Sequence, residues 1–143
     1  MRHLVFVFGT LKEGFPNFHV NAGTRVGQTF RTRERFPLFL VGERHVPWML
    51  AQPGAGLQVL GQVFEVNALT LRAMDDLEQI HEPDGYRRVE IEVEEELTSG
   101  QNQGIKVFAY LKPAEHLTVD LPRVGPLSEY TAEHAELYRP RAG

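Results

Sequence analysis

The sequence contains no cysteine, which excludes disulfide bonds and thiolate catalysis for this chain. It also has no uninterrupted apolar run of about 18 residues, the length that indicates a transmembrane helix. The first residues run directly into a short apolar segment without a small-residue cleavage site, so we expect no signal peptide. A chain without cysteine fits a reducing compartment, and we expect a cytoplasmic protein with no membrane partner.

Several motifs of common enzyme classes are missing as well. The chain has six histidines, but none shows a metal-ligand spacing such as HExxH, so the sequence indicates no metal site. The only serines, Ser99 and Ser128, do not lie in a GxSxG turn, which argues against a serine hydrolase. The glycine-rich GxGxxG and Walker patterns of nucleotide-binding proteins are absent too.

The composition that remains is that of an ordinary globular protein. The 143 residues are 42% apolar and 24% charged, and they contain no repeat and no low-complexity linker. We therefore expect one domain that spans residues 1–143. The net charge of −4 argues against a general nucleic-acid surface, so no nucleic-acid partner is expected. The sequence does not indicate an oligomeric state.

Strand signals dominate the chain. The expected strands are residues 4–8, 26–32, 37–41, 46–51, 57–66, 87–97 and 105–113. The last two flank a polar loop at 98–104 and predict a hairpin. The alternation of apolar and acidic residues in 87–97 predicts that one face of this strand is exposed to solvent. Gly61, inside the fifth of these segments, suggests a β-bulge.

One helix is expected at residues 67–80, with Asn67 or Thr70 as its N-cap. The helical period predicts an apolar arc of Leu69, Ala73, Met74, Leu77 and Ile80. The opposite, polar side would then carry Arg72, Asp75, Asp76 and Gln79, and the two aspartates are interpreted as solvated. A second, weaker helix is expected at 128–137. Many short strands with one or two helices predict an α+β, barrel-like fold.

Glu78 is the first candidate for chemistry. On the expected helix it lies at the rim of the apolar face, beside Met74 and Leu71. Partial desolvation there would raise the pKa of the Glu78 carboxyl and suit it to move protons near neutral pH. The alternative is a structural glutamate that reaches water or pairs with Arg87 or Arg88.

The second candidate is the loop after the first strand, in VFVFGTLKEGFPNFH at residues 5–19. The apolar run stops at Gly9 and Thr10 instead of at an ordinary surface turn. A glycine allows a sharp turn and close approach of a ligand, and successive backbone N–H groups can form a concavity that binds an anion. The alternative is a plain strand-to-loop turn.

Five segments together resemble a known family. They are residues 5–19, HVPWML at 45–50, GQVFEV at 61–66, MDDLEQIHEPDGYRR at 74–88 and YTAEHAELYRPR at 130–141. Their order and spacing resemble the gamma-glutamylamine cyclotransferases of the gamma-glutamylcyclotransferase-like superfamily. The first segment resembles the family's YGTLK strand end, and the fourth resembles its LDxxE motif followed by Y-x-R. The matches are collinear over nearly the whole chain.

The resemblance implies a small mixed β-barrel with one main helix and a short C-terminal helix. It implies conversion of a γ-glutamyl amine to 5-oxoproline and free amine, a small-molecule substrate, and no cofactor. The last residue of LDxxE, the family's catalytic glutamate, falls on Glu78. The family's substrate-binding positions fall on Phe8, Gly9, Thr10, Leu11 and Tyr86.

Two positions depart from the family pattern. Phe8 stands where the family has tyrosine, and Met74 replaces the first residue of LDxxE. The first change removes a hydroxyl, whose role could pass to Thr10 or Tyr86. It leaves open a non-catalytic domain that binds γ-glutamyl compounds, or an enzyme for another γ-glutamyl conjugate. In the latter case we expect the loops at 33–36 and 98–104 to shape the amine pocket.

Overall fold

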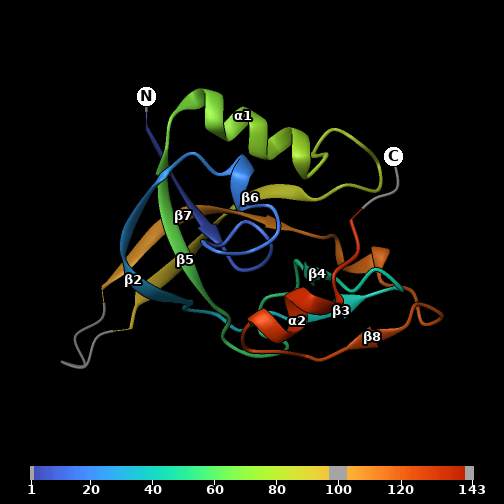
Figure 1. Cartoon of the computed structure of the whole chain (residues 1–143). Helices are drawn as coiled ribbons and strands as arrows, with labels where there is room; N and C mark the ends of the chain where they lie inside the picture. Colours follow the sequence, from blue (N-terminus) through green and yellow to red (C-terminus); the bar gives the residue numbers. More distant parts are fainter. Residues whose placement is uncertain (1, 97–102, 141–143) are drawn as a thin grey trace.

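A closed five-stranded barrel forms the body of the protein (Figure 1). The computed structural model describes residues 2–96 and 103–140. In their order around the barrel, the strands are β1 (His3–Val7), β5 (Leu60–Val66), β2 (Thr24–Thr32), β6 (Arg87–Glu95) and β7 (Gly104–Leu111). All neighbours are antiparallel except β1 and β7, whose parallel pairing closes the barrel. The mixed barrel expected for this chain is confirmed.

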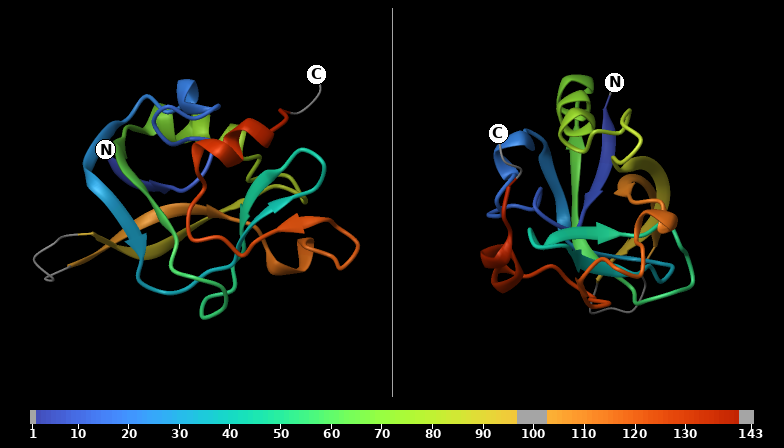
Figure 2. Two further views of the ribbon diagram at one scale, coloured as in Figure 1. Left: turned by 60° about the horizontal axis from the view of Figure 1, so that its bottom comes forward. Right: turned by 90° about the vertical axis from the view of Figure 1, so that its right-hand side faces the viewer.

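A small second sheet lies on the side of the barrel away from the main helix (Figures 1 and 2). Its strands, in spatial order, are β4 (Val46–Met49), β3 (Leu38–Val41) and β8 (Arg123–Val124). A bridge between Leu50 and Lys112 joins it to the end of β7. The two-residue strand β8 is exposed, and the sequence analysis missed it because so short a segment has no readable period.

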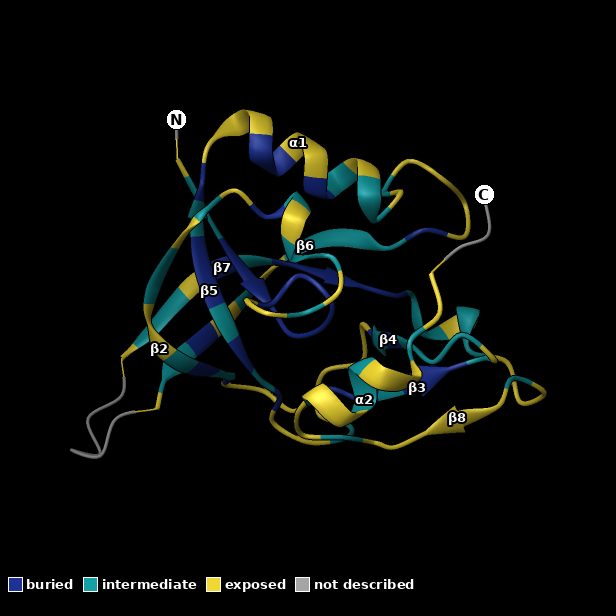
Figure 3. Cartoon of the chain, viewed as in Figure 1, coloured by how far each residue is buried: buried dark blue, intermediate teal, exposed yellow. Residues whose placement is uncertain are grey.

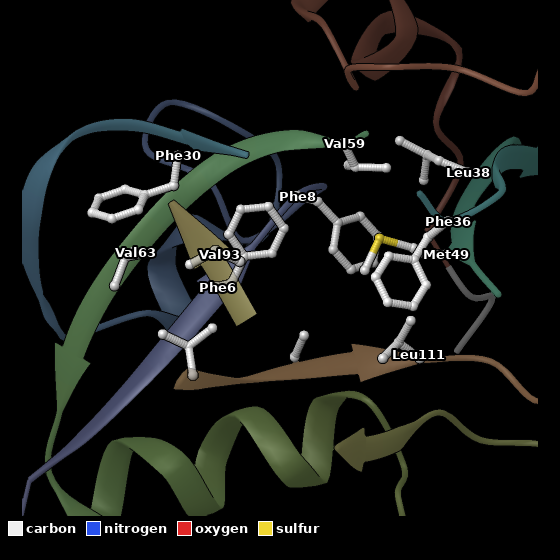
Figure 4. Close-up of a cluster of buried hydrophobic side chains, with 12 residues drawn as sticks. Phe6, Phe8, Phe30, Phe36, Leu38, Met49, Val59, Val63, Val93 and Leu111 are labelled. Atoms are coloured by element: carbon white, nitrogen blue, oxygen red, sulfur yellow. The ribbon is translucent and has the colours of Figure 1, made fainter. Parts of the chain in front are cut away.

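Phenylalanine and branched aliphatic side chains fill the barrel and extend toward the second sheet (Figure 4). The largest cluster comprises Phe6, Phe8, Phe30, Phe36, Leu38, Met49, Val59, Val63, Val93, Val107, Ala109 and Leu111. Burial of these apolar surfaces provides the main driving force for folding.

The predicted hairpin is present as the antiparallel pair β6–β7, while most of its predicted loop, 98–102, lies outside the described residues.

The irregularity predicted at Gly61 lies mainly in the partner strand. The register of β2 against β5 shifts between Val26 and Phe30, where Phe30 opposes Gly61 itself. A Cβ atom at Gly61 would lie 2.5 Å from the carbonyl oxygen of Val7 and 2.7 Å from the ring of Phe6. The glycine therefore allows β1 and its aromatic side chain to pack tightly against β5.

The main helix, α1 (Ala68–Leu77), begins where the sequence predicted and ends earlier. Asn67 is the N-cap: its side chain accepts a hydrogen bond of 2.9 Å from the backbone N–H of Thr70. At the other end the chain leaves the helix at Glu78, and Gln79 adopts a left-handed conformation with φ of 53°. The expected extension to residue 80 is therefore wrong, because the backbone turns before it.

The buried face of α1 differs from the predicted arc. Leu69 is 77% exposed and Ala73 is exposed, whereas Leu71 and Met74 are buried against the barrel (Figure 3). Two apolar positions of the arc thus point outward because Thr70 and Leu71 occupy the docking face. Sequence periodicity locates an apolar stripe only to within about one helical position.

The remaining helical segments are short. They are the 3-10 helices η1 (Phe18–Val20) and η2 (Ala114–His116) and the helix α2 (Ala132–Leu137). The expected C-terminal helix is thus confirmed but begins later than residue 128, after the N-cap Thr131, whose side chain and His134 form a capping box. Within the described residues, no helix has the length and apolar character needed to cross a membrane.

Replacement of Asn67 by Ala should lower the free energy of unfolding by about 1 kcal/mol, because the amide of Thr70 loses its only side-chain acceptor at the start of α1. Urea unfolding followed by circular dichroism measures this difference. Asn67→Asp keeps an acceptor at the cap and serves as the control. Equal stability of the Ala and Asp variants would show that the cap does not stabilise α1.

Candidate active site

A cavity of about 650 Å³ lies between the end of β1, the C-terminal end of α1, the strand β4 and the segment after β7. Its walls include every residue that the sequence analysis assigned to a site. These residues are Phe8, Gly9, Thr10, Leu11, Glu78 and Tyr86. The chain thus brings together two segments that are about 70 positions apart in sequence.

Hydrogen bonds to the carbonyl and hydroxyl oxygens of Thr10 hold the loop after β1 in place. Asn17 donates a backbone hydrogen bond of 2.8 Å to the carbonyl of Thr10 and a side-chain bond of 2.9 Å to its hydroxyl. The backbone N–H groups of Gly9, Thr10 and Leu11, by contrast, donate no hydrogen bond to any described residue. All three residues are buried and line the cavity, so the loop presents consecutive donors suited to an anion.

Gly9 is required by packing and not by an unusual backbone angle, since its φ is not positive. A Cβ atom there would lie 2.9 Å from Cγ of Pro47 in β4. The carbonyl of the same proline accepts a 2.8 Å hydrogen bond from the hydroxyl of Tyr86. Pro47 therefore joins the loop after β1 to the segment that follows α1, and Gly9 allows this close contact.

Phe8 belongs to both the cavity wall and the core. Its side chain is 6% exposed, its ring centroid lies 6.5 Å from that of Phe6, and it packs in the same cluster as Met49 and Phe36 (Figure 4). An aromatic ring without a hydroxyl is well suited to this apolar surrounding.

Glu78 lies at the C-terminal end of α1, where its backbone N–H still donates a 2.9 Å bond to Met74. Its carbonyl accepts a 3.0 Å bond from the N–H of Tyr86, so both residues are fixed to each other across the connecting loop. Of the two arginines considered in the sequence analysis, Arg88 pairs with Asp75, and Arg87 donates to backbone carbonyls of the connecting loop.

Asp75 corrects the sequence analysis, which interpreted it as solvated. Its side chain is only 14% exposed, forms an ion pair with Arg88, and accepts a 2.6 Å hydrogen bond from the hydroxyl of Tyr110. The helix docks with this aspartate against the hairpin β6–β7. The cation and the hydroxyl that pair with it lie on separate strands, so no local pattern near residue 75 reveals the contact.

Tyr110 and Lys112 are cavity residues that the sequence analysis missed. Burial, the hydrogen bond to Asp75 and the negative charges of Asp75 and Glu78 raise the pKa of the Tyr110 hydroxyl, so it stays protonated. The ammonium of Lys112 donates to the carbonyl of Asp84 and lies 4.4 Å from the ring centroid of Trp48. Lys112 is buried and lines the cavity, so it brings a positive charge to the wall.

The cavity continues beyond these groups toward a second region. Its wall there is formed by Val41, Gly42, Arg44, His116, Thr118, Leu121 and Tyr138. The loop 33–36, which was expected to shape an amine pocket, does not line this cavity in the described part of the chain. Phe36 packs in the core, and Arg33 pairs with Glu92 on β6, so that expectation is wrong for 33–36.

Comparisons with known proteins show to which chains this one is similar. A family model described as "Gamma-glutamyl cyclotransferase, AIG2-like" matches residues 5–132. The rat protein named gamma-glutamylaminecyclotransferase is 40% identical over 114 residues, which cover 74% of this chain and 75% of the rat protein. The bovine protein of the same name is 36% identical over 144 aligned positions, covering 96% of this chain and 82% of its own length.

A solved structure shows the same arrangement. The mouse AIG2-like protein superposes with a TM-score of 0.80 at 32% sequence identity, and the match covers 99% of this chain and 98% of the mouse chain. At this identity and coverage, the likeness extends over the barrel, α1 and the second sheet together.

Replacement of Gly9 by Val should strongly reduce the affinity for 5-oxoproline and lower the melting temperature only slightly. The new side chain would meet Pro47 and displace the loop amides, while the barrel core would be left in place. Gly9→Ala should give a smaller effect of the same kind. Calorimetric binding and thermal unfolding measure the two quantities, and parallel losses in both would indicate a purely structural turn.

Proposed function

The chain belongs to the gamma-glutamyl cyclotransferase, AIG2-like family, and on this premise we propose that it converts a γ-glutamyl amine, such as γ-glutamyl-ε-lysine, to 5-oxoproline and the free amine. One observation carries the proposal beyond the family. A carboxylate at the end of α1 and three buried backbone amides without partners in the described chain line the same cavity.

The proposed reaction is an intramolecular acyl transfer. The α-amino nitrogen of the substrate attacks its own γ-carbonyl carbon, a new C–N bond closes the five-membered ring, and the C–N bond to the leaving amine breaks. Because nucleophile and electrophile belong to one molecule, the protein mainly has to hold the folded-back conformer. The proposal needs no co-reactant.

Glu78 is the proposed general base and acid. The attacking amine is an ammonium at neutral pH and must lose a proton, and the leaving nitrogen must gain one. A single carboxylate beside both nitrogens can accept the first proton and deliver the second. The contacts of Glu78 with Met74 and Tyr86 support this role, because they fix the end of the helix that carries the carboxylate.

The amides of Gly9, Thr10 and Leu11 are the proposed donors to the α-carboxylate of the γ-glutamyl head or to the oxyanion that develops on its γ-carbonyl. Their lack of partners in the described chain supports this assignment. Tyr86 contributes its ring to the wall, since its hydroxyl already donates to Pro47. Because Phe8 lacks a hydroxyl, Thr10 carries the one side-chain hydroxyl of residues 8–11.

Glu78→Gln should lower the rate of 5-oxoproline release from γ-glutamyl-ε-lysine by about 10²- to 10⁴-fold, the usual cost of losing a general acid–base group. Release of 5-oxoproline is measured by chromatography. The matched control is Glu82→Gln, an exposed glutamate four positions away that does not line the cavity. A Glu78→Gln variant as active as the parent would remove Glu78 from the mechanism.

The enzyme should react far more slowly with a γ-glutamyl-ε-lysine whose glutamyl α-carboxylate is converted to the carboxamide. This analogue keeps the α-amine and the γ-amide bond that breaks, but it has no α-carboxylate for the loop amides, and each buried donor left without a good acceptor costs about 1–3 kcal/mol. Rates of amine release are compared for the two substrates at equal concentration. Comparable rates would show that the loop does not recognise the carboxylate.

Phe8 lines the cavity but lacks the hydroxyl of the tyrosine that the family has there. This difference supports a second candidate function, a domain that binds γ-glutamyl compounds without turnover. In that case γ-glutamyl-ε-lysine raises the melting temperature of the protein but is not consumed. The chromatographic assay described above separates the two functions.

A further inference from the structure

The hydroxyl of Tyr110 lies beneath the C-terminal turn of α1, close to two carboxylates. Asp75 and Glu78 are three positions apart, so they lie on the same side of the helix end. Tyr110 comes from β7, on the barrel below, and lines the cavity. Its hydroxyl donates a 2.6 Å hydrogen bond to Oδ1 of Asp75. The negative charge of Glu78 contributes to the raised pKa of this hydroxyl.

This hydrogen bond determines whether the Tyr110 hydroxyl can act as a donor or as an acceptor toward a ligand. A phenol has one O–H to donate, and here it is used for Asp75, so toward any ligand the Tyr110 oxygen acts as an acceptor. A donor bonded to an anion also becomes a better acceptor, because the O–H bond is polarised. The group therefore suits a ligand that carries N–H donors and a positive charge.

The aspartate itself is fixed by a second contact. Arg88, on β6, pairs with Oδ2 of Asp75, and its guanidinium carbon lies 5.0 Å from the ring centroid of Phe108. The ion pair compensates the charge of Asp75. Of the carboxylates of Asp75 and Glu78, that of Glu78 belongs to a residue that lines the cavity. Asp75 thus serves to orient Tyr110 and does not itself line the cavity.

We infer that the Tyr110 oxygen and the Glu78 carboxylate together form the subsite for the α-ammonium of the γ-glutamyl head, and that Asp75 is a positioning residue acting through Tyr110. This inference rests on the proposed function. Two acceptors on one side of the ammonium hold its nitrogen beside the carboxylate that takes its proton. After that transfer the Tyr110 oxygen still accepts an N–H bond, which orients the nitrogen lone pair toward the γ-carbonyl.

The raised pKa of Tyr110 is consistent with this arrangement. Burial, the hydrogen bond to Asp75 and the two carboxylate charges all favour the protonated phenol. The hydroxyl therefore keeps its bond to Asp75 over the neutral pH range and does not compete with Glu78 for the proton of the substrate.

The test compares two ligands that differ only in the α-amine: γ-glutamyl-ε-lysine and the corresponding glutaryl amide of lysine. Binding is measured by calorimetry in the Glu78→Gln background, with and without Tyr110→Phe. We expect Tyr110→Phe to weaken binding of the amine-bearing ligand about 10-fold, the usual effect of a hydrogen bond to a charged group, and to leave the glutaryl amide within about twofold.

Tyr86→Phe is the matched control, because it removes a hydroxyl from the same cavity wall that donates to the backbone of Pro47. It should affect both ligands equally. Asp75→Asn keeps an acceptor for Tyr110 but loses the charge, and it should give a smaller loss that is again selective for the amine-bearing ligand. This variant also decides the matter if Tyr110→Phe does not fold, as judged by thermal unfolding.

Equal losses for both ligands, or no loss for the amine-bearing one, would overturn the subsite even if the parent protein releases 5-oxoproline. A parent protein that releases no 5-oxoproline, and whose Glu78→Gln variant binds neither ligand, would overturn the proposed function and the subsite with it. The two failures are therefore distinguishable.

Discussion

Three buried backbone amides without acceptors set the main constraint on this molecule. In the described chain, the N–H groups of Gly9, Thr10 and Leu11 have no partner, and such donors are costly inside a protein unless a ligand or water satisfies them. The surrounding structure keeps them in this state. Asn17 donates hydrogen bonds to the carbonyl and hydroxyl of Thr10, and Pro47 packs against Gly9, so the loop is held on both sides.

The carboxylate opposite depends on how α1 ends. The helix stops at Glu78 because the next residue turns into the left-handed region, and the N–H of Tyr86 then ties the chain back to Glu78. Asp75, one turn earlier, is clamped to the hairpin β6–β7 by Arg88 and Tyr110. These contacts fix the height and rotation of the helix end over the barrel, which rigid support of an acid–base group requires.

The sequence predicted the element types well and the long-range contacts poorly. Hairpin β6–β7, the cap at Asn67 and the mixed barrel are confirmed because local period, cap chemistry and family resemblance act over short stretches or whole motifs. The burial of Asp75 and the exposure of Leu69 depend on how α1 docks, and the chain does not encode that rotation locally. The cavity wall at 112–121 was likewise invisible, because only folding brings it beside β1.

The central claim is that the amides after β1 bind a carboxylate, and a nuclear magnetic resonance titration with 5-oxoproline tests it most directly. The account predicts that the backbone ¹H signals of Gly9, Thr10 and Leu11 move downfield together and saturate with one binding constant, as expected for N–H groups that gain a charged acceptor. Saturable shifts confined to the distant wall around Arg44 and His116, with the three loop amides unmoved, would contradict it.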